Sequence, residues 1–424
     1  MMQPAENGQA GGKRAAAMPF ILIAVLIDMI SIGLMVPVLP HIVGTFTKSN
    51  DEQALAFLAV TTAFGVANFF GSPVLGALSD RYGRRPVLLL GFTGLALSFF
   101  VTAVATALWV LVLVRVFSGA MQSNISIANA YVADISAPED RARRFGQVGA
   151  MFGVGFILGP VIGGVLGDID VHLPFVVAGG MALLNGVYGY FVLPESLPVE
   201  RRRPFEWKRA NPVTALRGLA ALKGVGALVI VMAFSSLAQF MLHMTWVLYT
   251  KFRFGWGPGQ VGWSLFAVGV ASTLSQGFLL RPMLKRISPQ RLAIIAMVSG
   301  AIAYAAFGLA TVPWVIYAVI ALNLLGGMGN AAMQSIVSNA ADARTQGQTM
   351  GAMSSVNSLM AVIAPILGLE MLRWVSHRPA DDLLVGLPLF ASSALMVVAT
   401  LIAVRFFRRQ KAAAALAPAN PVAP

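Results

Sequence analysis

Long apolar segments recur along almost the whole of this chain, and they limit its possible folds more than any other feature. Each is close to the roughly 20 residues that an α-helix needs to cross the hydrocarbon core of a bilayer. Strands of a membrane barrel are only about ten residues long and alternate apolar with polar positions, and these segments do neither. The sequence therefore predicts an all-α membrane protein with twelve transmembrane helices. The predicted helices are residues 19–39, 55–78, 87–106, 108–131, 145–167, 174–193, 225–249, 259–281, 291–310, 314–338, 347–372 and 385–405.

The composition excludes several other classes of protein. Hydrophobic residues make up 57% of the 424 residues and charged residues only 11%, whereas soluble proteins carry about 25% charged residues. The chain has no cysteine, which excludes disulfides, and its four histidines lack the spacing of a metal site. A net charge of +13 would indicate a nucleic-acid partner for a soluble protein. Here the orientation of the helices explains the charge better, so we do not expect a nucleic-acid partner. Because the histidines lack the spacing of a metal site, we do not expect a bound metal either.

The positive charges fall on one side of the predicted membrane. Cytoplasmic loops of membrane proteins carry an excess of lysine and arginine. If the N-terminus is cytoplasmic, 24 of the 30 lysine and arginine residues lie in or beside the cytoplasmic segments. This predicts cytoplasmic tails at residues 1–18 and 406–424, and a multi-pass protein of a bacterial inner membrane.

A long polar stretch at residues 194–224 divides the helices into two groups of six, 19–193 and 225–405. A faint internal echo supports a duplication, because "PVLGALSDRYGRRPVLL" lines up with "FLLRPMLKRISPQRLAI" about 205 residues later. Paired six-helix halves with a binding site between them are an architecture of transporters. We therefore expect two pseudo-symmetric six-helix bundles joined by a cytoplasmic linker. The two halves suffice for a monomer, and a dimer is the alternative.

The short turn between the second and third predicted helices reads "GALSDRYGRRP". Gly76 would let the helix end approach a neighbour closely, as small residues do in membranes, and Gly83 would permit a tight turn. Asp80 can accept N–H groups at the start of another helix, while Arg84 and Arg85 offer forked donors to carboxylates. A turn that only sets the topology is the alternative, but it would not require the acid or the glycines.

This turn resembles the signature G-x-L-x-D-R-x-G-R-R-P of the major facilitator superfamily, and Arg81 supplies its first arginine. In that family the loop is a conformational latch between the two halves in the outward-open state. The resemblance implies that Asp80 faces the start of the helix 347–372, near Gly347. It also implies that Arg84 pairs with Asp134 at the cytoplasmic end of the helix 108–131.

The predicted helix 145–167 carries "GVGFILGPVIGG". Gly155, Gly159 and Gly163 recur every four residues, so they form one flat face on which helix backbones can touch. Pro160 can bend the helix. With Gly164 the segment resembles the antiporter motif G-x-x-x-G-P-x-x-G-G of the family, which is associated with exporters. Ordinary tight packing is the other interpretation of the same glycines.

The predicted helix 108–131 places a charge and several amides in the membrane. Arg115 needs a partner or water, because a central arginine costs about 2.5–3.5 kcal/mol on insertion scales. Together with Gly119 it resembles the R-x-x-x-G motif of the family, which is linked to proton transfer. Gln122, Asn124 and Asn129 follow on the same helix and are candidates for substrate binding, with hydrogen bonding between helices as the alternative.

Asp28 lies at the midpoint of the first predicted helix and is the carboxylate placed deepest in the bilayer. A lone carboxylate there should take up a proton or find a cation, which suits proton coupling; a structural ion pair with Arg115 is the alternative. The pattern D-x-x-x-I-G-x-x-x-P-V-L-P resembles the tetracycline-exporter branch of proton-coupled drug antiporters. Three helices depart from that branch. Ser98 and Ser299 stand in helices where its members carry acids, and Ser272 and Ser275 stand in the helix where its members carry a histidine.

Further polar candidates lie in the second half of the chain. His243 is the single histidine placed within the membrane there and is a second candidate for proton coupling, since an imidazole titrates near neutral pH; a packing role is its alternative. Gln239 and Trp246 share its helix face. The predicted substrate-binding positions of this half are Gln239, Trp246, Asn323, Gln334 and Asn357.

These features predict a secondary transporter that uses the proton gradient, without a cofactor, to export amphipathic small molecules. A proton-coupled transporter of a native metabolite, such as a sugar or an organic acid, is the nearest alternative. A receptor or scaffold would not need the membrane aspartate or the glycine face. An intramembrane enzyme is excluded because the sequence offers no nucleophile–base pair and no metal cluster. The expected partners are the lipid bilayer, protons and a small-molecule substrate.

Overall fold

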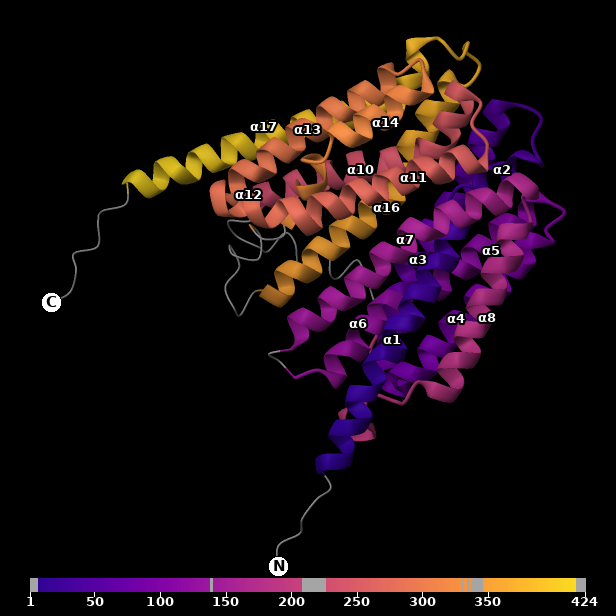
Figure 1. The fold of residues 1–424 in the computed structure, drawn as a ribbon, viewed down its shortest axis with the longest axis vertical. Coiled ribbons are helices and arrows are strands. Elements are labelled where there is room, and N and C mark those ends of the chain that lie inside the picture. The colour runs from indigo at the N-terminus through magenta and orange to yellow at the C-terminus, as the bar shows by residue number, and fades with distance from the viewer. Residues whose placement is uncertain are drawn as a thin grey trace, which may run out of the picture. The chain divides into compact units, whose positions relative to one another are not determined.

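The computed structural model describes residues 7–137, 140–207, 226–329, 331–333, 336 and 346–416. These residues form helices joined by short turns (Figure 1). The helices are α1 Asn7–Met35, α2 Leu39–Gly44, α3 Asn50–Tyr82, α4 Arg84–Ala103, α5 Leu108–Met121, α6 Asn124–Ile135, α7 Arg141–Ile169, α8 Leu173–Val192, η1 Val199–Arg201, α10 Gly226–Phe254, α11 Pro258–Thr273, η2 Leu274–Leu279, α12 Leu280–Arg286, α13 Pro289–Leu309, α14 Pro313–Leu322, η3 Gly326–Met328, α16 Gln346–Val375, η4 Leu383–Gly386 and α17 Leu387–Leu416.

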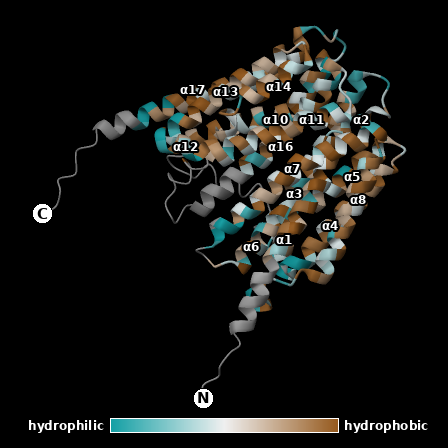
Figure 2. Cartoon of the chain, viewed as in Figure 1, coloured by the Kyte–Doolittle hydropathy of each residue, from teal (hydrophilic) through white to brown (hydrophobic). Residues whose placement is uncertain are grey.

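Within the described residues, eleven helical segments are long and apolar enough to cross a membrane. A twelfth span results if Pro313–Leu322 and Gly326–Met333, which meet at an angle of 53°, are counted as one. Hydrophobic residues run along these helices, and hydrophilic residues gather towards helix ends and turns (Figure 2). The predicted all-α membrane fold is confirmed.

Several helices begin where the sequence supplies a cap. Ser49 precedes α3 and accepts the backbone N–H of Glu52 at 3.1 Å, and Ser288 precedes α13, whose first residue is Pro289. Serine at the cap satisfies an N–H group that the helix leaves unpaired, and proline at the first helical position lacks the N–H that would be unpaired. These two helix starts are therefore encoded locally, although the spans themselves are defined by hydropathy.

The predicted continuous helix 108–131 is wrong at its centre. The chain leaves helical geometry at Gln122 and Ser123, so α5 ends and α6 begins there. Asn68 of α3 donates its side-chain N–H to the carbonyl oxygen of Gln122 at 2.7 Å and to that of Gly119 at 3.3 Å. Carbonyl groups freed by a break inside a membrane need such partners, and hydropathy alone cannot indicate a break that polar contacts stabilise.

The chain divides into two compact units. The first comprises Met1–Thr214, Trp246–Val270 and Leu369–Ala380, and the second comprises Ala215–Thr245, Ala271–Gly368 and Asp381–Pro424. In the first unit, α1 packs against α6, α7 and α8, α3 packs against α5, and α4 packs against α8. In the second unit, α13 packs against α14 and α17.

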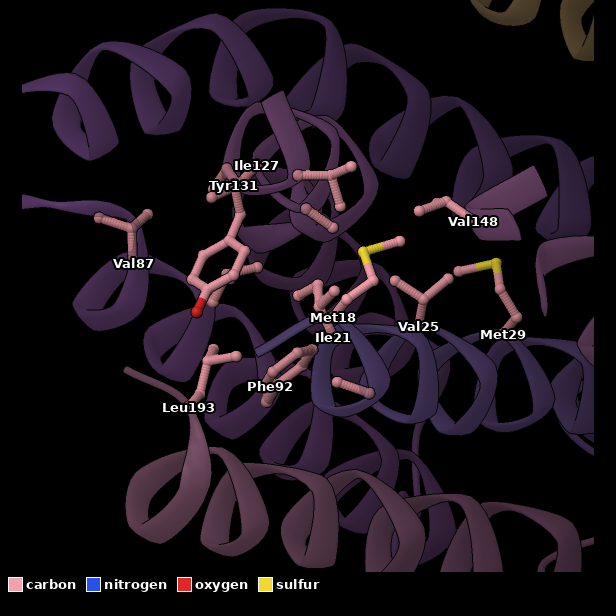
Figure 3. Close-up of a cluster of buried hydrophobic side chains, with 14 of the residues drawn as sticks. Met18, Ile21, Val25, Met29, Val87, Phe92, Ile127, Tyr131, Val148 and Leu193 are labelled. Atoms are coloured by element: carbon pink, nitrogen blue, oxygen red, sulfur yellow. The ribbon is translucent and has the colours of Figure 1, made fainter. Parts of the chain in front are cut away.

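The core of the first unit surrounds α1 (Figure 3). Met18, Ile21, Val25 and Met29 recur at helical spacing and are nearly inaccessible to solvent. Side chains from three other helices and from the end of α8 close over them: Val87, Phe92, Ile127, Tyr131, Val148 and Leu193. The face of α1 next to Asp28 is therefore held in a packed environment, in which the position of a side chain is well defined.

Candidate functional site

Asp28 occupies the middle of the first membrane span, with only 2% of its surface exposed. Its Oδ1 atom accepts a hydrogen bond from the side-chain Nδ2 of Asn124, the first residue of α6, at 2.9 Å. Two of the predicted site residues, from helices far apart in the sequence, thus meet. An ionised carboxylate with so few polar partners is costly to keep in an apolar core, so this group is well suited to bind and release a proton.

Arg115 is also buried, with 3% of its surface exposed. Its Nε and Nη2 atoms have no hydrogen-bond partner within the described part of the chain. Among the described residues no ion pair joins it to Asp28, whose side-chain partner is Asn124. The structure therefore does not support the alternative of a structural Asp28–Arg115 pair.

The other amides of the first half have different surroundings. Gln122 lies in the break between α5 and α6, and its backbone carbonyl is the acceptor for Asn68. Asn129 lies half-buried on α6, about one and a half turns beyond Asn124. A role of either side chain in binding substrate stays a prediction.

In the second half of the chain, Gln239 is half-buried and His243 is exposed on α10. Trp246, one turn further, is 4% exposed and donates its indole N–H to Ser264 of α11 at 3.0 Å, so it serves packing in this structure. Asn323 accepts a hydrogen bond from Ser299 at 2.8 Å, and Asn357 accepts one from Ser236 at 2.6 Å. Gln334 lies outside the described residues.

The glycine face of α7 lies against α1, as its spacing predicts. A Cβ at Gly159 would lie 2.6 Å from the Cα of Gly33, and one at Gly155 would lie 2.5 Å from the Cβ of Met29. A Cβ at Gly163 would overlap the carbonyl oxygen of Leu34. These contacts require glycine, because any side chain would push the two backbones apart.

Two further residues of this motif face a different helix. A Cβ at Gly164 would lie 2.7 Å from the carbonyl oxygen of Pro258, and the carbonyl oxygen of Pro160 lies 2.5 Å from where a Cβ of Gly262 would be. Both partners belong to α11, which within the first unit packs against this side of α7. Helix α7 therefore packs closely against both α1 and α11.

The turn at residues 76–86 is built around Arg84. Its guanidinium pairs with Asp134 at 3.1 Å, as predicted, and with Asp80 at 2.5 Å. The expected close approach at Gly76 stays a prediction, since no described atom lies within 4 Å of the position of a Cβ. The neighbour expected for Asp80, near Gly347, is a residue whose side-chain surroundings lie outside the description.

The two flanking arginines of the turn contact aromatic rings. The guanidinium of Arg81 lies 5.1 Å from the ring centre of Tyr82, and that of Arg85 lies 5.7 Å from the ring centre of Tyr190. Arg85 also donates to the backbone carbonyl of Tyr190. Cation–π contacts of this kind hold a guanidinium in place while its charge stays close to water.

Residues 21–365 match the sequence profile of the Major Facilitator Superfamily. The chain belongs to the major facilitator superfamily. This family consists of transporters and not of enzymes, so the exclusion of an enzyme is confirmed. As a major facilitator, the chain is a multi-pass membrane protein that moves a small-molecule substrate.

Curated relatives of this facilitator cover most of its length. The chain is 36% identical to the class C tetracycline resistance protein of Escherichia coli, over 83% of this chain and 88% of that protein. It is 26% identical to the multidrug resistance protein 2 of Bacillus subtilis, over 82% and 86%. The resemblance to the tetracycline-exporter branch is thereby confirmed.

Solved structures show the same fold at low sequence identity. The nucleoside transporter NupG matches with a TM-score of 0.73 at 15% identity, over 92% of this chain and 99% of that one. The human organic anion transporter MFSD10 (TETRAN) matches with a TM-score of 0.67 at 22% identity, over 92% and 99%.

Glu195 was not identified from the sequence, but it contacts the turn of this facilitator. Its carboxylate accepts the backbone N–H groups of Arg84 at 2.8 Å and Arg85 at 3.2 Å, at the start of α4, and that of Leu197 at 2.9 Å. A carboxylate at a helix N-terminus satisfies unpaired donors and interacts favourably with the helix dipole. The signal in the sequence was "PES" directly after an apolar helix, where a single acid precedes a basic linker.

Gly83 of this turn should tolerate no side chain. Its φ of 107° and ψ of 161° fall in a region essentially restricted to glycine, and a Cβ would overlap the Glu195 carboxylate. We expect Gly83→Ala to lower stability by about 1–3 kcal/mol, measured by thermal unfolding in detergent. Gly76→Ala, in the same segment and with no described atom within 4 Å of the position of its Cβ, should leave stability unchanged or raise it; equal losses in both variants would refute this account.

Proposed function

We propose that this facilitator is a proton-coupled exporter of amphipathic small molecules in a bacterial inner membrane, with both termini in the cytoplasm. The observation that carries the proposal is the carboxyl group of Asp28, buried at mid-span with one amide as its side-chain partner. The names of the curated relatives, tetracycline and multidrug resistance proteins, support export of drug-like compounds. The proposed energy source is the proton gradient. Among the described residues no group of three metal-binding side chains is found.

In the proposed cycle, Asp28 releases its proton towards the cytoplasm as the substrate binds. Arg115 and His243 assist proton movement, and the substrate contacts the polar side chains near the middle of the spans. Protonation from the outside then accompanies substrate release. Each pH unit across the membrane supplies about 1.4 kcal/mol per proton, and the membrane potential adds roughly 2.3 kcal/mol per charge per 100 mV.

The candidates for substrate contact are the residues predicted from the sequence, of which Trp246 serves packing in this structure. They are Gln122, Asn124, Asn129, Gln239, Trp246, Asn323, Gln334 and Asn357. A native sugar or organic acid is the alternative substrate. An organic acid would require cationic side chains. The buried cations of the described membrane segments include Arg115 and Arg253, and Arg253 already donates to the backbone carbonyl of Ala380. An amphipathic compound fits the amide-rich and largely uncharged spans better.

Transport in everted membrane vesicles tests this function. Vesicles that contain the protein are energised to acidify their interior, and accumulation of tetracycline or ethidium is followed by fluorescence. We expect accumulation that collapses when nigericin dissipates the pH gradient and that is absent from vesicles without the protein. Failure to accumulate either compound, together with gradient-dependent movement of a radiolabelled sugar or organic acid, would replace export of drugs by the metabolite alternative.

Alternating access requires contacts on the proposed outer side to break. Within the first unit, Asp168 at the end of α7 accepts the N–H of Gly259 at the start of α11, at 2.9 Å. Lys251 donates to Gln53 at 2.6 Å, and Arg373 pairs with Asp51 at 3.1 Å. Residues of the second six-helix half are thereby bonded to residues of the first. We propose that these contacts seal the outer side until the substrate is released.

Removing the Asp168 contact should loosen this seal. The chain has no cysteine, so a single cysteine can be introduced without removing others. Val261→Cys places it on α11 at a position with 0% exposure, where its labelling reports access of a thiol reagent. We expect Asp168→Ala to raise the rate of labelling by a membrane-impermeant maleimide from outside by about tenfold, because a hydrogen bond to a charged group contributes about 1.5 kcal/mol or more.

Asp170→Ala is the matched control for this experiment. The backbone N–H of His172 donates to Asp170 at 2.7 Å and keeps the pKa of that carboxyl below its usual range. This bond is local to the turn and joins no two helices. Labelling should stay at the parental rate in this variant, and equal rates in both variants would contradict the proposed seal.

A further inference from the structure

Asn124 uses only one end of its side-chain amide. Nδ2 donates to Asp28 at 2.9 Å, whereas Oδ1 is buried and has no hydrogen-bond partner among the described residues. The residue is 6% exposed, so its side chain cannot turn freely into water. A buried amide oxygen without a partner is uncommon in folded proteins and calls for an explanation.

The unpartnered oxygen lies against Gly91 of α4. A Cβ at this position would overlap Asn124 Oδ1, so glycine is what allows the amide to occupy this space. The space left by the missing side chain of Gly91 lies beside the Asn124 amide, because Gly91 itself is buried on α4. In the sequence Gly91 is one small residue within an apolar run, with nothing to connect it to residue 28.

The break in the helical span places this amide. Gln122 and Ser123 depart from helical geometry, and α6 restarts at Asn124. An uninterrupted helix would rotate and shift every residue beyond the break. The break therefore sets which side chain of α6 reaches the carboxyl group on α1.

A carboxyl group that binds and releases a proton needs a donor in one state and an acceptor in the other. Ionised aspartate only accepts hydrogen bonds, whereas protonated aspartate also donates one. An asparagine amide carries both a donor and an acceptor, and rotation of its terminal torsion exchanges them. The two ends of the Asn124 amide therefore match the two states of Asp28.

Among the described residues, charged groups of the neighbouring helices do not supply the hydrogen-bond donor and acceptor that Asp28 needs. Asp134 lies near the end of α6, Asp168 near the end of α7, and α8 carries no charged residue. Arg115 of α5 forms no ion pair with Asp28 among the described residues. The surroundings of the Asp28 carboxyl group are its buried position and the Asn124 amide.

We infer that Asn124 is a positioning residue for the proton-carrying group and not a substrate ligand: its amide donates to ionised Asp28, rotates to accept from protonated Asp28, and has room to do so because residue 91 is glycine. This inference rests on the proposed role of Asp28 in proton coupling. It removes Asn124 from the predicted substrate contacts and adds Gly91 to the proton site.

Two variants should perturb the proton site in different ways. Asn124→Leu keeps the shape of the side chain but removes the donor, so ionised Asp28 loses its partner and the pH dependence of transport should move by about one unit or more towards alkaline pH. Gly91→Ala crowds the amide and should move the profile in the same direction. Asn124→Gln restores an amide and should recover part of the parental profile.

Infrared difference spectroscopy of the purified protein reads the protonation of Asp28 directly, since the C=O band of a protonated carboxyl group is absent when the group is ionised. The band assigned by its loss in Asp28→Asn should titrate at a higher pH in Asn124→Leu and Gly91→Ala. Gly186→Ala is the control, because its Cβ would meet α4 only at an ordinary 3.8 Å, and the band should titrate there as in the parent.

The outcomes separate this inference from the proposed function. An unchanged band and an unchanged pH profile in Asn124→Leu, with only slower transport or a lower yield, would assign Asn124 to packing and overturn the inference. If Asp28→Asn still exports against a gradient, the proposed role of Asp28 as proton carrier fails, yet the infrared titration still shows whether Asn124 controls protonation of Asp28.

Discussion

Asp28→Asn is expected to abolish uphill export while leaving downhill exchange of substrate intact. Asparagine has nearly the same shape as aspartate but neither binds nor releases a proton. In the parent, a gradient of one pH unit supplies about 1.4 kcal/mol per proton, which supports about tenfold accumulation. Without the carrier, accumulation in energised everted vesicles should not exceed the level set by passive equilibration.

The measurement compares gradient-driven accumulation with counterflow of tetracycline in proteoliposomes without a gradient. Asp170→Asn is the matched control, because this aspartate lies exposed in a turn and its carboxylate accepts hydrogen bonds from the neighbouring His172. It should accumulate substrate as the parent does. Gradient-dependent accumulation by Asp28→Asn would show that another group carries the proton, and loss of counterflow as well would indicate a general defect.

Hydropathy was sufficient to predict the fold because the membrane imposes one element and one length. The spans observed for the first, sixth and ninth predicted helices, Met18–Gly44, Leu173–Val192 and Pro289–Leu309, lie close to their predicted ranges. The break at Gln122 could not be predicted in this way, because its freed carbonyls are satisfied by Asn68, more than 50 residues earlier. Such a contact adds no apolar or polar pattern to the segment that breaks.

The parts of the site that follow from local chemistry were also predictable. A lone acid at mid-span and a run of glycines every four residues are visible in the sequence itself, whereas the Arg84–Asp134 pair was expected from the resemblance to the family. The partners of these residues could not be predicted from such patterns. Glu195 and Gly91 act through contacts with residues far along the chain, and a glycine in an apolar run looks the same whether it faces lipid or makes room for an amide.

The contact of α7 with α1 should be the packing feature least tolerant of change. A methyl group at Gly163 would overlap the backbone carbonyl of Leu34, and backbone cannot rotate away as a side chain can. We expect Gly163→Ala to cost about 1–3 kcal/mol through overpacking, seen as a lower melting temperature and a smaller monodisperse fraction in detergent. Because α1 carries Asp28, transport per folded molecule should fall as well.

Gly153→Ala provides the comparison that isolates this effect. Gly153 lies on the same helix, and no described atom lies within 4 Å of the position of its Cβ. Alanine favours the helix over glycine by about 1 kcal/mol at either position, so the difference between the two variants reports the packing against α1 alone. Gly153→Ala should be as stable as the parent or more so. If Gly163→Ala is equally stable, α1 and α7 can separate without loss, and the glycine face does not fix the helix that bears the proton-carrying acid.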